Sequence, residues 1–203
     1  MNVSHVEVLV EEPSTEAALR TLLPNLLDEQ TFHIYPHSGK HDLLGKLPDR
    51  LRGYKSWLPP DWRVVVVVDR DSEDCHALKM KLEEIASDAG LPTRSVARHS
   101  YSVVNRLAIE ELEAWYFGDW NAVRAAYPEV PEGVPRRKNY RDPDAIAGGT
   151  WECFERILQR AGYFRNGLRK IEAARAIAAH WEPDANASRS FQVLRDTFRE
   201  IAS

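Results

Sequence analysis

Five consecutive valines, Val64–Val68, constrain the fold more than any other feature of this sequence. Successive side chains of a β-strand point to opposite faces, so a strand built from this run is apolar on both faces. Such a strand is typical of the interior of a parallel sheet that has helices packed on both sides. We therefore predict that Arg63–Val68 forms an inner strand, which ends at Asp69.

Alternating patterns elsewhere in the chain indicate further strands and helices. Apolar and β-branched residues predict strands at Val3–Val10 and Thr31–Tyr35, and a strand or a hairpin within Ser95–Leu107. Apolar residues at helical spacing predict several helices, and Ser14 or Thr15 is suited to cap the first of them. These helices are Glu16–Leu27 (bent or shortened by Pro24), Asp42–Trp57, Glu73–Ala89, Ala108–Phe117, Thr150–Arg160, Leu168–His180 and Phe191–Ile201.

The order of these elements predicts an α/β fold with a Rossmann-like, mainly parallel sheet flanked by helices. The strands Val3–Val10 and Arg63–Val68 are expected to be adjacent inner strands. We assign residues 1–118 to the α/β domain and residues 119–203 to a helical C-terminal extension. Because no Gly/Ser linker separates the two parts, we expect the extension to pack on the sheet. Residues 128–150 have the composition of a long exposed loop.

The composition is that of an ordinary globular protein, with 43% hydrophobic and 29% charged residues in a chain of 203. The longest apolar run is the five-valine segment, whereas a membrane-spanning helix needs about 20 apolar residues. The first residues lack the basic and apolar regions of a secretory signal. Cys75 and Cys153 have no metal-ligand or redox spacing. We expect a cytoplasmic protein with reduced thiols and no membrane segment.

The net charge of −4 argues against a simple basic nucleic-acid coat. Residues 1–118 are acidic, whereas residues 119–203 carry a slight positive charge. This distribution fits a carboxylate-rich site beside a surface that tolerates polyanions, although surface charge that merely varies would look the same. The absence of a P-loop, a GxGxxG motif and a serine-nucleophile elbow excludes a self-contained NTPase, a Rossmann dehydrogenase and a serine hydrolase.

Two of the predicted strands end in acidic residues. Glu11 and Glu12 follow the first strand, and Asp69 and Asp71 follow the valine run. Ligands of open α/β sheets bind at the C-terminal ends of the strands, where neighbouring carboxylates repel each other unless a cation lies between them. Oxygen ligands of this kind suit Mg²⁺ or Mn²⁺. A helix cap is the alternative for the aspartates, since Asp71 or Ser72 is suited to cap the following helix.

These strand ends resemble the Toprim domain that topoisomerases, bacterial primases and nucleases of the overcoming-lysogenization-defect type share. Val8–Glu16 resembles its strand ending in Glu, and Val65–Asp71 resembles its later strand ending in Asp-x-Asp. Ile109–Trp115 resembles the Glu-x-Glu-Ala-Trp segment of small stand-alone Toprim-like proteins of unknown function, which often neighbour an ATPase in prokaryotic defence loci. Ser188–Phe191 is weakly similar to the same proteins. Glu12 stands where the Toprim pattern usually has Gly.

The resemblance implies that Asp69 and Asp71 hold Mg²⁺ or Mn²⁺ beside a scissile phosphate. It implies that Glu11 is a metal ligand or the general acid/base. A divalent ion in such a site polarises the phosphoryl oxygen and activates water. Glu111 and Glu113 are two residues apart and cannot share a helix face, so we expect at most one to reach the site from a helix. The further candidate metal ligands are Glu16, Asp74, Glu111 and Glu113.

Basic residues are candidates for binding nucleic-acid phosphates. One lies between the two aspartates, and the others belong to a basic and aromatic stretch around Tyr140 that is suited to grip phosphates and stack a base. A solvated loop is the alternative interpretation of that stretch. The candidates are Arg70, Arg136, Arg137, Lys138 and Arg141.

The combined pattern predicts a Mg²⁺-dependent nuclease that hydrolyses phosphodiester bonds in a prokaryotic defence system, with a partner ATPase of the ABC or SMC type. The alternative is a non-catalytic Toprim-like subunit that binds a partner ATPase or nucleic acid. A response-regulator receiver also binds Mg²⁺ at an acidic site, but no suitable Lys follows a late strand here. Self-association into a homodimer is compatible with each of these functions.

Overall fold

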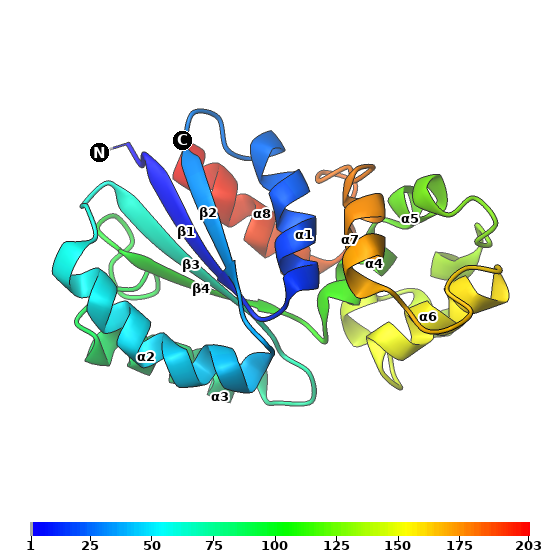
Figure 1. Cartoon of the computed structure of the whole chain (residues 1–203), viewed down its shortest axis with the longest axis horizontal. Helices are drawn as coiled ribbons and strands as arrows, with labels where there is room; N and C mark the ends of the chain where they lie inside the picture. The colour runs from blue at the N-terminus through cyan, green and yellow to red at the C-terminus, as the bar shows by residue number, and fades with distance from the viewer. Residues whose placement is uncertain (1) are drawn as a thin grey trace.

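A computed structural model describes residues 2–203, and within them it contains one sheet of four parallel strands (Figure 1). The strands are β1 (His5–Val10), β2 (Thr31–Pro36), β3 (Trp62–Asp69) and β4 (Val103–Ala108), in the spatial order β2-β1-β3-β4. β1 and β3 pair with each other and are the inner strands. The predicted α/β fold and the predicted adjacency of these two strands are therefore confirmed.

Helices connect the strands and continue beyond the last one. None of the helices between residues 2 and 203 combines the length and apolar character that crossing a membrane requires. Short 3₁₀ turns are η1 (Leu23–Asn25), η2 (Val134–Arg136), η3 (Lys138–Tyr140) and η4 (Pro143–Ala145). The α-helices are α1 (Pro13–Leu22), α2 (Lys40–Trp57), α3 (Cys75–Asp88), α4 (Leu112–Gly118), α5 (Trp120–Ala126), α6 (Thr150–Arg160), α7 (Lys170–Ala178) and α8 (Arg189–Ala202).

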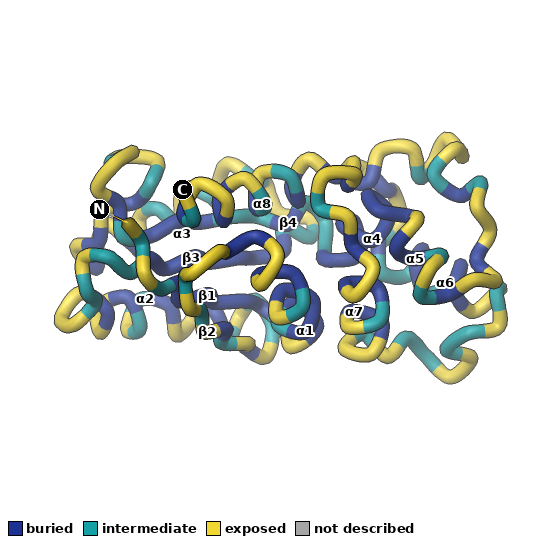
Figure 2. The backbone as a smooth tube through the Cα atoms, turned by 90° about the horizontal axis from the view of Figure 1, so that it is seen from above, coloured by how far each residue is buried: buried dark blue, intermediate teal, exposed yellow. Residues whose placement is uncertain are grey.

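The valine run of β3 is buried on both faces, as its sequence predicts. Val64, Val66 and Val68 pack with apolar residues of α2 and α3. Val65 and Val67 belong to a second apolar cluster, which includes residues of α1 and α8. Figure 2 shows the strands as a buried layer between exposed outer segments. The two-sided burial fixes β3 in the interior of the sheet.

Helices α4, α5, α6 and α7 form a lobe beyond the C-terminal ends of the strands, on the right of Figure 1. α7 packs along α1, whereas α8 returns to the sheet and packs on β4. There, Arg106 Nε of β4 donates a hydrogen bond to Thr197 Oγ1 of α8 at 2.6 Å. One apolar cluster includes Val8, Phe117 and Phe154. The lobe is thus joined to the sheet region by a continuous core and covers the edge at which the strands end.

The first helix differs from its predicted range at both ends. It begins at Pro13 rather than Glu16, because proline is well suited to the first helical turn. It ends at Leu22 rather than Leu27, since Pro24 opens the 3₁₀ turn η1. The predicted shortening at Pro24 is confirmed, but the predicted serine or threonine cap is wrong, because no side chain caps this helix.

The predicted helix Ala108–Phe117 also begins later than expected. Ala108 is the last residue of β4, Ile109 and Glu110 form a bend, and the extended residue Glu111 precedes α4. The tertiary pairing of β4 with β3 therefore overrides the helical pattern at this point. Of the two structures predicted for Ser95–Leu107, a single strand or a hairpin, the structure contains the single strand β4.

The prediction of a long exposed loop at residues 128–150 is wrong in part. The segment contains three 3₁₀ turns, and Val134 and Ile146 are buried against the lobe. The ring of Tyr140 stacks on Phe117 with a centroid distance of 5.3 Å. These apolar anchors hold the segment to the lobe despite its Pro- and Gly-rich composition.

A buried hydrogen-bond network fastens the start of α8 to α4 and η4. Asn186 Nδ2 donates to the Trp115 carbonyl at 2.9 Å, and Asn186 Oδ1 accepts from the Ser188 amide at 2.9 Å. Asp144 accepts hydrogen bonds from the hydroxyls of Ser188 at 2.7 Å and Ser190 at 3.0 Å. Trp115 Nε1 donates to Ser190 Oγ at 3.0 Å. The network joins three segments that are distant in the sequence.

The network makes Gly118 sensitive to substitution. In Gly118→Ala, the added Cβ would collide with Asn186 Oδ1 and lie 2.8 Å from Ser188 N. We expect a loss of about 1–3 kcal/mol in unfolding free energy, as in other overpacked sites. Gly53→Ala is the control, because an added Cβ on this exposed face of α2 has no atom within 4 Å. It should raise stability by about 0.5–1 kcal/mol. Equal urea midpoints for both variants would contradict this account.

Candidate functional site

The two inner strands bring acidic residues together at the C-terminal edge of the sheet. Glu11 follows β1 directly, and Asp69 is the last residue of β3. Each is 7% exposed, and Glu11 Oε2 accepts a hydrogen bond from the Asp69 amide at 3.1 Å. The Glu11 carbonyl accepts from the Gly39 amide at 3.0 Å, and Gly39 has a φ of +98° that favours glycine. The position of Glu11 is therefore fixed by both of its neighbouring strand ends.

The turns that follow β3 and β4 are tied to each other. Asp71 and Glu110 have left-handed φ angles of 51° and 62°, which cost non-glycine residues on the order of 1 kcal/mol each. The Arg70 amide donates to the Ala108 carbonyl at 2.8 Å, and the Asp71 amide donates to the Glu110 carbonyl at 2.9 Å. Arg70 and Glu110 also form an ion pair. These contacts hold Asp71 close enough for its charge to act on Glu11.

We define the acidic cluster as Glu11, Glu12, Asp69, Asp71 and Glu113. Burial raises the pKa of Glu11 to about 7, and it also raises the pKa of Glu113 to about 7. Burial raises the pKa of Asp69 well above its ordinary value, and the charges of Glu11, Glu113 and Glu12 add to this rise. Crowded carboxylates in a buried position disfavour ionisation, so a cation placed among them would be bound favourably.

Two lysines from other parts of the chain contact the acidic cluster. Lys40, at the start of α2, forms ion pairs with Asp71 at 2.6 Å and with Glu73 at 2.9 Å. Lys170, at the start of α7, lies 3.4 Å from Glu12 Oε2. Burial alone would lower the pKa of Lys170, but Glu113 and Glu12 raise it above its ordinary value. The cluster is therefore partly neutralised by the protein itself.

Glu12 adopts an extended conformation with φ −134° and ψ 155°. Any residue can adopt this backbone conformation, so the departure from the Toprim glycine is sterically compatible with the turn after β1. The side chain accepts a hydrogen bond from Ser14 Oγ at 3.1 Å and faces Lys170. Glu12 therefore adds a carboxylate to the site without distorting Glu11.

Of three other candidate metal ligands, one belongs to the acidic cluster and two have partners outside it. Glu113 lies in the first turn of α4 and belongs to the acidic cluster, whereas Glu111 precedes the helix and accepts a hydrogen bond from the Trp151 amide at 3.0 Å. Glu16 forms an ion pair with Arg20 on α1 at 2.6 Å.

Asp74 has a structural role at the start of α3. Its carboxylate accepts a hydrogen bond from the Ala77 amide at 2.8 Å, which caps the helix. The predicted cap at Asp71 or Ser72 is therefore wrong, because the helix begins three to four residues later than either residue. The Asp71 side chain does not cap α3 and forms an ion pair with Lys40 instead.

The basic candidates lie in two places. Arg70 is in the turn after β3, where Glu110 pairs with it and its Nε donates to the Asp71 carbonyl at 3.2 Å. The others are exposed on the lobe, around the turns η2 and η3. The aromatic ring of that stretch, Tyr140, is half-buried and stacks on Phe117. The exposed cations are Arg136, Arg137, Lys138 and Arg141.

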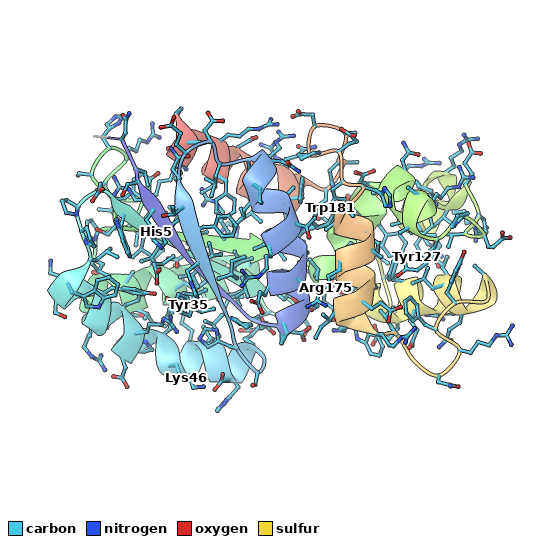
Figure 3. The ribbon with its side chains drawn as sticks, turned by 45° about the horizontal axis from the view of Figure 1, so that its top comes forward. His5, Tyr35, Lys46, Tyr127, Arg175 and Trp181 are labelled. Atoms are coloured by element: carbon cyan, nitrogen blue, oxygen red, sulfur yellow. The ribbon has the colours of Figure 1, made fainter. Side chains whose placement is uncertain are left out.

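Lys40 and Lys170 were not among the site residues predicted from the sequence. Lys40 follows the end of β2, and the C-terminal ends of parallel strands share one edge of the sheet, so its position carried a usable signal. Lys170 lies more than 150 residues from Glu12. Only the packing of α7 along α1 brings Lys170 to the site. Figure 3 shows these two helices side by side, with Arg175 labelled on α7.

The donor chemistry of the acidic cluster fits a hard divalent cation, because every side chain in it offers carboxylate oxygens. Glu11 and Asp69 lie at the ends of adjacent strands and the charge of Glu11 acts on the Asp69 carboxylate, so these two residues would hold such an ion. Within residues 2–203, however, no group of three or more His, Cys, Asp or Glu side chains is arranged to hold a metal ion. Asp71 is turned toward Lys40.

Comparison with known proteins gives one match. A family model described as a domain of unknown function (DUF4276) matches residues 10–199. Searches of curated proteins and of solved structures found no match. The matched range begins at the last residue of β1 and ends within α8, so it covers β2, β3, β4 and the lobe.

The raised pKa values predict how stability depends on pH. Glu113 has a pKa of about 7 in the folded protein and about 4.5 when exposed, so between these values the folded state binds more protons than the unfolded state. Its contribution to stability is thus fully present below pH 4.5 and is lost as the pH rises through the folded-state pKa of about 7, by roughly 3 kcal/mol in total. Glu11 acts in the same direction.

Glu113→Gln tests this dependence, because the amide removes the charge at nearly unchanged volume. With a chelator present, the wild type should be more stable at pH 5.5 than at pH 8. The variant should lose less stability over the same range and should be more stable than the wild type at pH 8. Urea unfolding at several pH values measures both, and parallel pH profiles for the two proteins would contradict the prediction.

Proposed function

The chain belongs to the family of a domain of unknown function (DUF4276), and we propose that it is a Mg²⁺- or Mn²⁺-dependent nuclease that hydrolyses phosphodiester bonds. The observation that carries this proposal is the meeting of Glu11 and Asp69 at the ends of the two inner strands, with the Asp69 amide 3.1 Å from Glu11 Oε2. Ligands of open α/β sheets bind at this edge.

The residues of the site have separate roles in this proposal. Glu11 and Asp69 would hold the ion, and Asp71 would approach it after release from Lys40. The bound ion would polarise a phosphoryl oxygen and activate water. Lys40 and Lys170 flank the acidic cluster and are suited to hold the negative phosphate beside it.

Sequence features support the same proposal. The segments that end in Glu11 and in Asp69-Arg70-Asp71 resemble the Toprim domain of several nucleases and topoisomerases. By the same resemblance, we propose a cytoplasmic defence role, with an ATPase of the ABC or SMC type as partner and nucleic acid as substrate. Cys75 and Cys153 are free thiols, in agreement with a reducing compartment.

A non-catalytic subunit is the second candidate function, and the two lysines favour it. Lys40 and Lys170 already supply positive charge to the acidic cluster, so the charge of a metal ion is partly replaced. In this alternative, the chain would bind a partner ATPase or nucleic acid and regulate it. Divalent-ion binding distinguishes the two functions.

Cleavage assays test the nuclease directly. The wild type should cleave plasmid DNA, single-stranded DNA or RNA in Mg²⁺ or Mn²⁺, and chelation should abolish cleavage. Asp69→Asn should reduce the rate by a factor of about 10² or more, because it removes a charge from the metal site. Asp28→Asn is the matched control, since Asp28 is exposed and distant from the cluster. Cleavage that survives Asp69→Asn would count against this site.

Metal binding gives a second readout that needs no substrate. Mg²⁺ at about 100 times its dissociation constant should stabilise the wild type by about 2.7 kcal/mol, whereas Asp69→Asn should show little gain. Thermal unfolding in Mg²⁺ and in chelator measures this difference. If Mg²⁺ and Mn²⁺ stabilise neither protein, the nuclease proposal fails and the non-catalytic subunit takes its place.

A further inference from the structure

A second charged site lies at the opposite end of the sheet from the acidic cluster. Arg94, Ser95, Arg98, His99 and Glu200 line a cavity of about 610 Å³, which we call the Arg94 pocket. The Arg94 amide donates to the Val103 carbonyl at the first residue of β4. A parallel strand rises about 3.3 Å per residue, so a strand of six to eight residues places the pocket about 20 Å from the acidic cluster.

The lining of the Arg94 pocket has an excess of positive charge. Arg94 is paired with Glu200, with Nε 2.9 Å from Oε1. In the part of the chain that the structure describes, the side chains of Arg98 and His99 have no hydrogen-bond or ion-pair partner. Glu200 is the one carboxylate among the lining residues. The pocket therefore offers one guanidinium, that of Arg98, and one imidazole, that of His99, as hydrogen-bonding groups for an anion.

Two further arginines lie near the pocket without lining it. Arg63 is 8% exposed, and its guanidinium lies 5.1 Å from the centroid of the Tyr101 ring. Arg63 Nη1 donates to the carbonyls of Pro60 and Trp62 at 2.8 Å, whereas its Nε is buried without a partner among residues 2–203. Arg106 donates its Nε to Thr197, and the charges of Arg94 and Glu200 act on it. Neither Arg63 nor Arg106 has a carboxylate partner within the described residues.

Buried or partly buried cations are usually paired, because an uncompensated charge in a low-dielectric site is costly. Glu200 compensates one guanidinium at most, and it already pairs with Arg94. Arg98 is exposed in the pocket lining, whereas Arg63 and Arg106 lie nearby and donate to backbone carbonyls, so an anion with two or more negative charges would meet an excess of positive charge here. Guanidinium groups match phosphate oxygens in planar, two-point hydrogen bonds, and the hydroxyl of Ser95 can add a further donor.

We propose that the Arg94 pocket binds a phosphate-bearing small anion, either inorganic pyrophosphate or the phosphates of a nucleotide. Its volume of about 610 Å³ lies within the range of small-molecule sites, roughly 300–1,000 Å³. The site uses residues from the segment before β4 and from the C-terminal end of α8, so it shares no residue with the acidic cluster. The inference does not depend on the proposed nuclease activity.

Isothermal titration calorimetry with pyrophosphate tests the proposal, in the full chain and with a chelator present so that no metal complex contributes. Arg98→Glu should weaken binding at least about tenfold, which corresponds to about 1.4 kcal/mol. Glu200→Gln should strengthen binding, because it removes the carboxylate that competes for Arg94. Arg160→Glu is the matched control, since Arg160 is exposed on α6 in the lobe. It should bind as the wild type does.

The opposite effects of Arg98→Glu and Glu200→Gln separate a binding site from a merely structural ion pair. The proposal is overturned if the wild type does not bind pyrophosphate or ADP, or if Arg98→Glu and Arg160→Glu weaken binding equally. Binding of ADP but not pyrophosphate would assign the site to nucleotides, and equal binding would assign it to the phosphates alone. Asp69→Asn should bind pyrophosphate as tightly as the wild type does. Pyrophosphate binding therefore tests the Arg94 pocket even if the nuclease proposal fails.

Discussion

The fold depends on the burial of β3 on both of its faces. Val64–Val68 has no polar side chain to present to water, so helices must cover the sheet on both sides. This requirement places α2 and α3 on one face and α1 and α8 on the other. It also makes β1 an inner neighbour, with β2 and β4 at the edges. The chain can therefore leave the apolar layer only at the strand ends, where Glu11 and Asp69 lie.

The acidic cluster stores unfavourable electrostatic energy that the rest of the fold must offset. Burial and mutual repulsion raise the pKa values of Glu11, Asp69 and Glu113, and the turn beside them contains Asp71 in a left-handed conformation. Strained or electrostatically costly groups of this kind gather at functional sites. The lobe covers this edge and brings Lys170 to it, so the lobe is part of the site rather than an appendage.

Most of the sheet was predictable, and the prediction failed where tertiary contacts override local pattern. The adjacency of the two inner strands followed from apolar runs that only a covered sheet can bury. The helical pattern at Ala108–Glu111 was misleading, because pairing with β3 draws Ala108 into a strand. The exposed-loop composition at residues 128–150 was misleading too, since Val134 and Ile146 find apolar partners in the lobe that composition cannot reveal.

By itself, the sequence determined the inner strand and the acidic residues that end it, because periodicity and chain adjacency are local properties. Only the tertiary structure decided that Lys170 reaches those residues, and that Glu113 rather than Glu111 joins them. The physical reason is that each arrives from a different helix, and no local pattern encodes which helices pack at one sheet edge. The Arg94 pocket likewise exists only because α8 returns to β4 and places Glu200 beside Arg94.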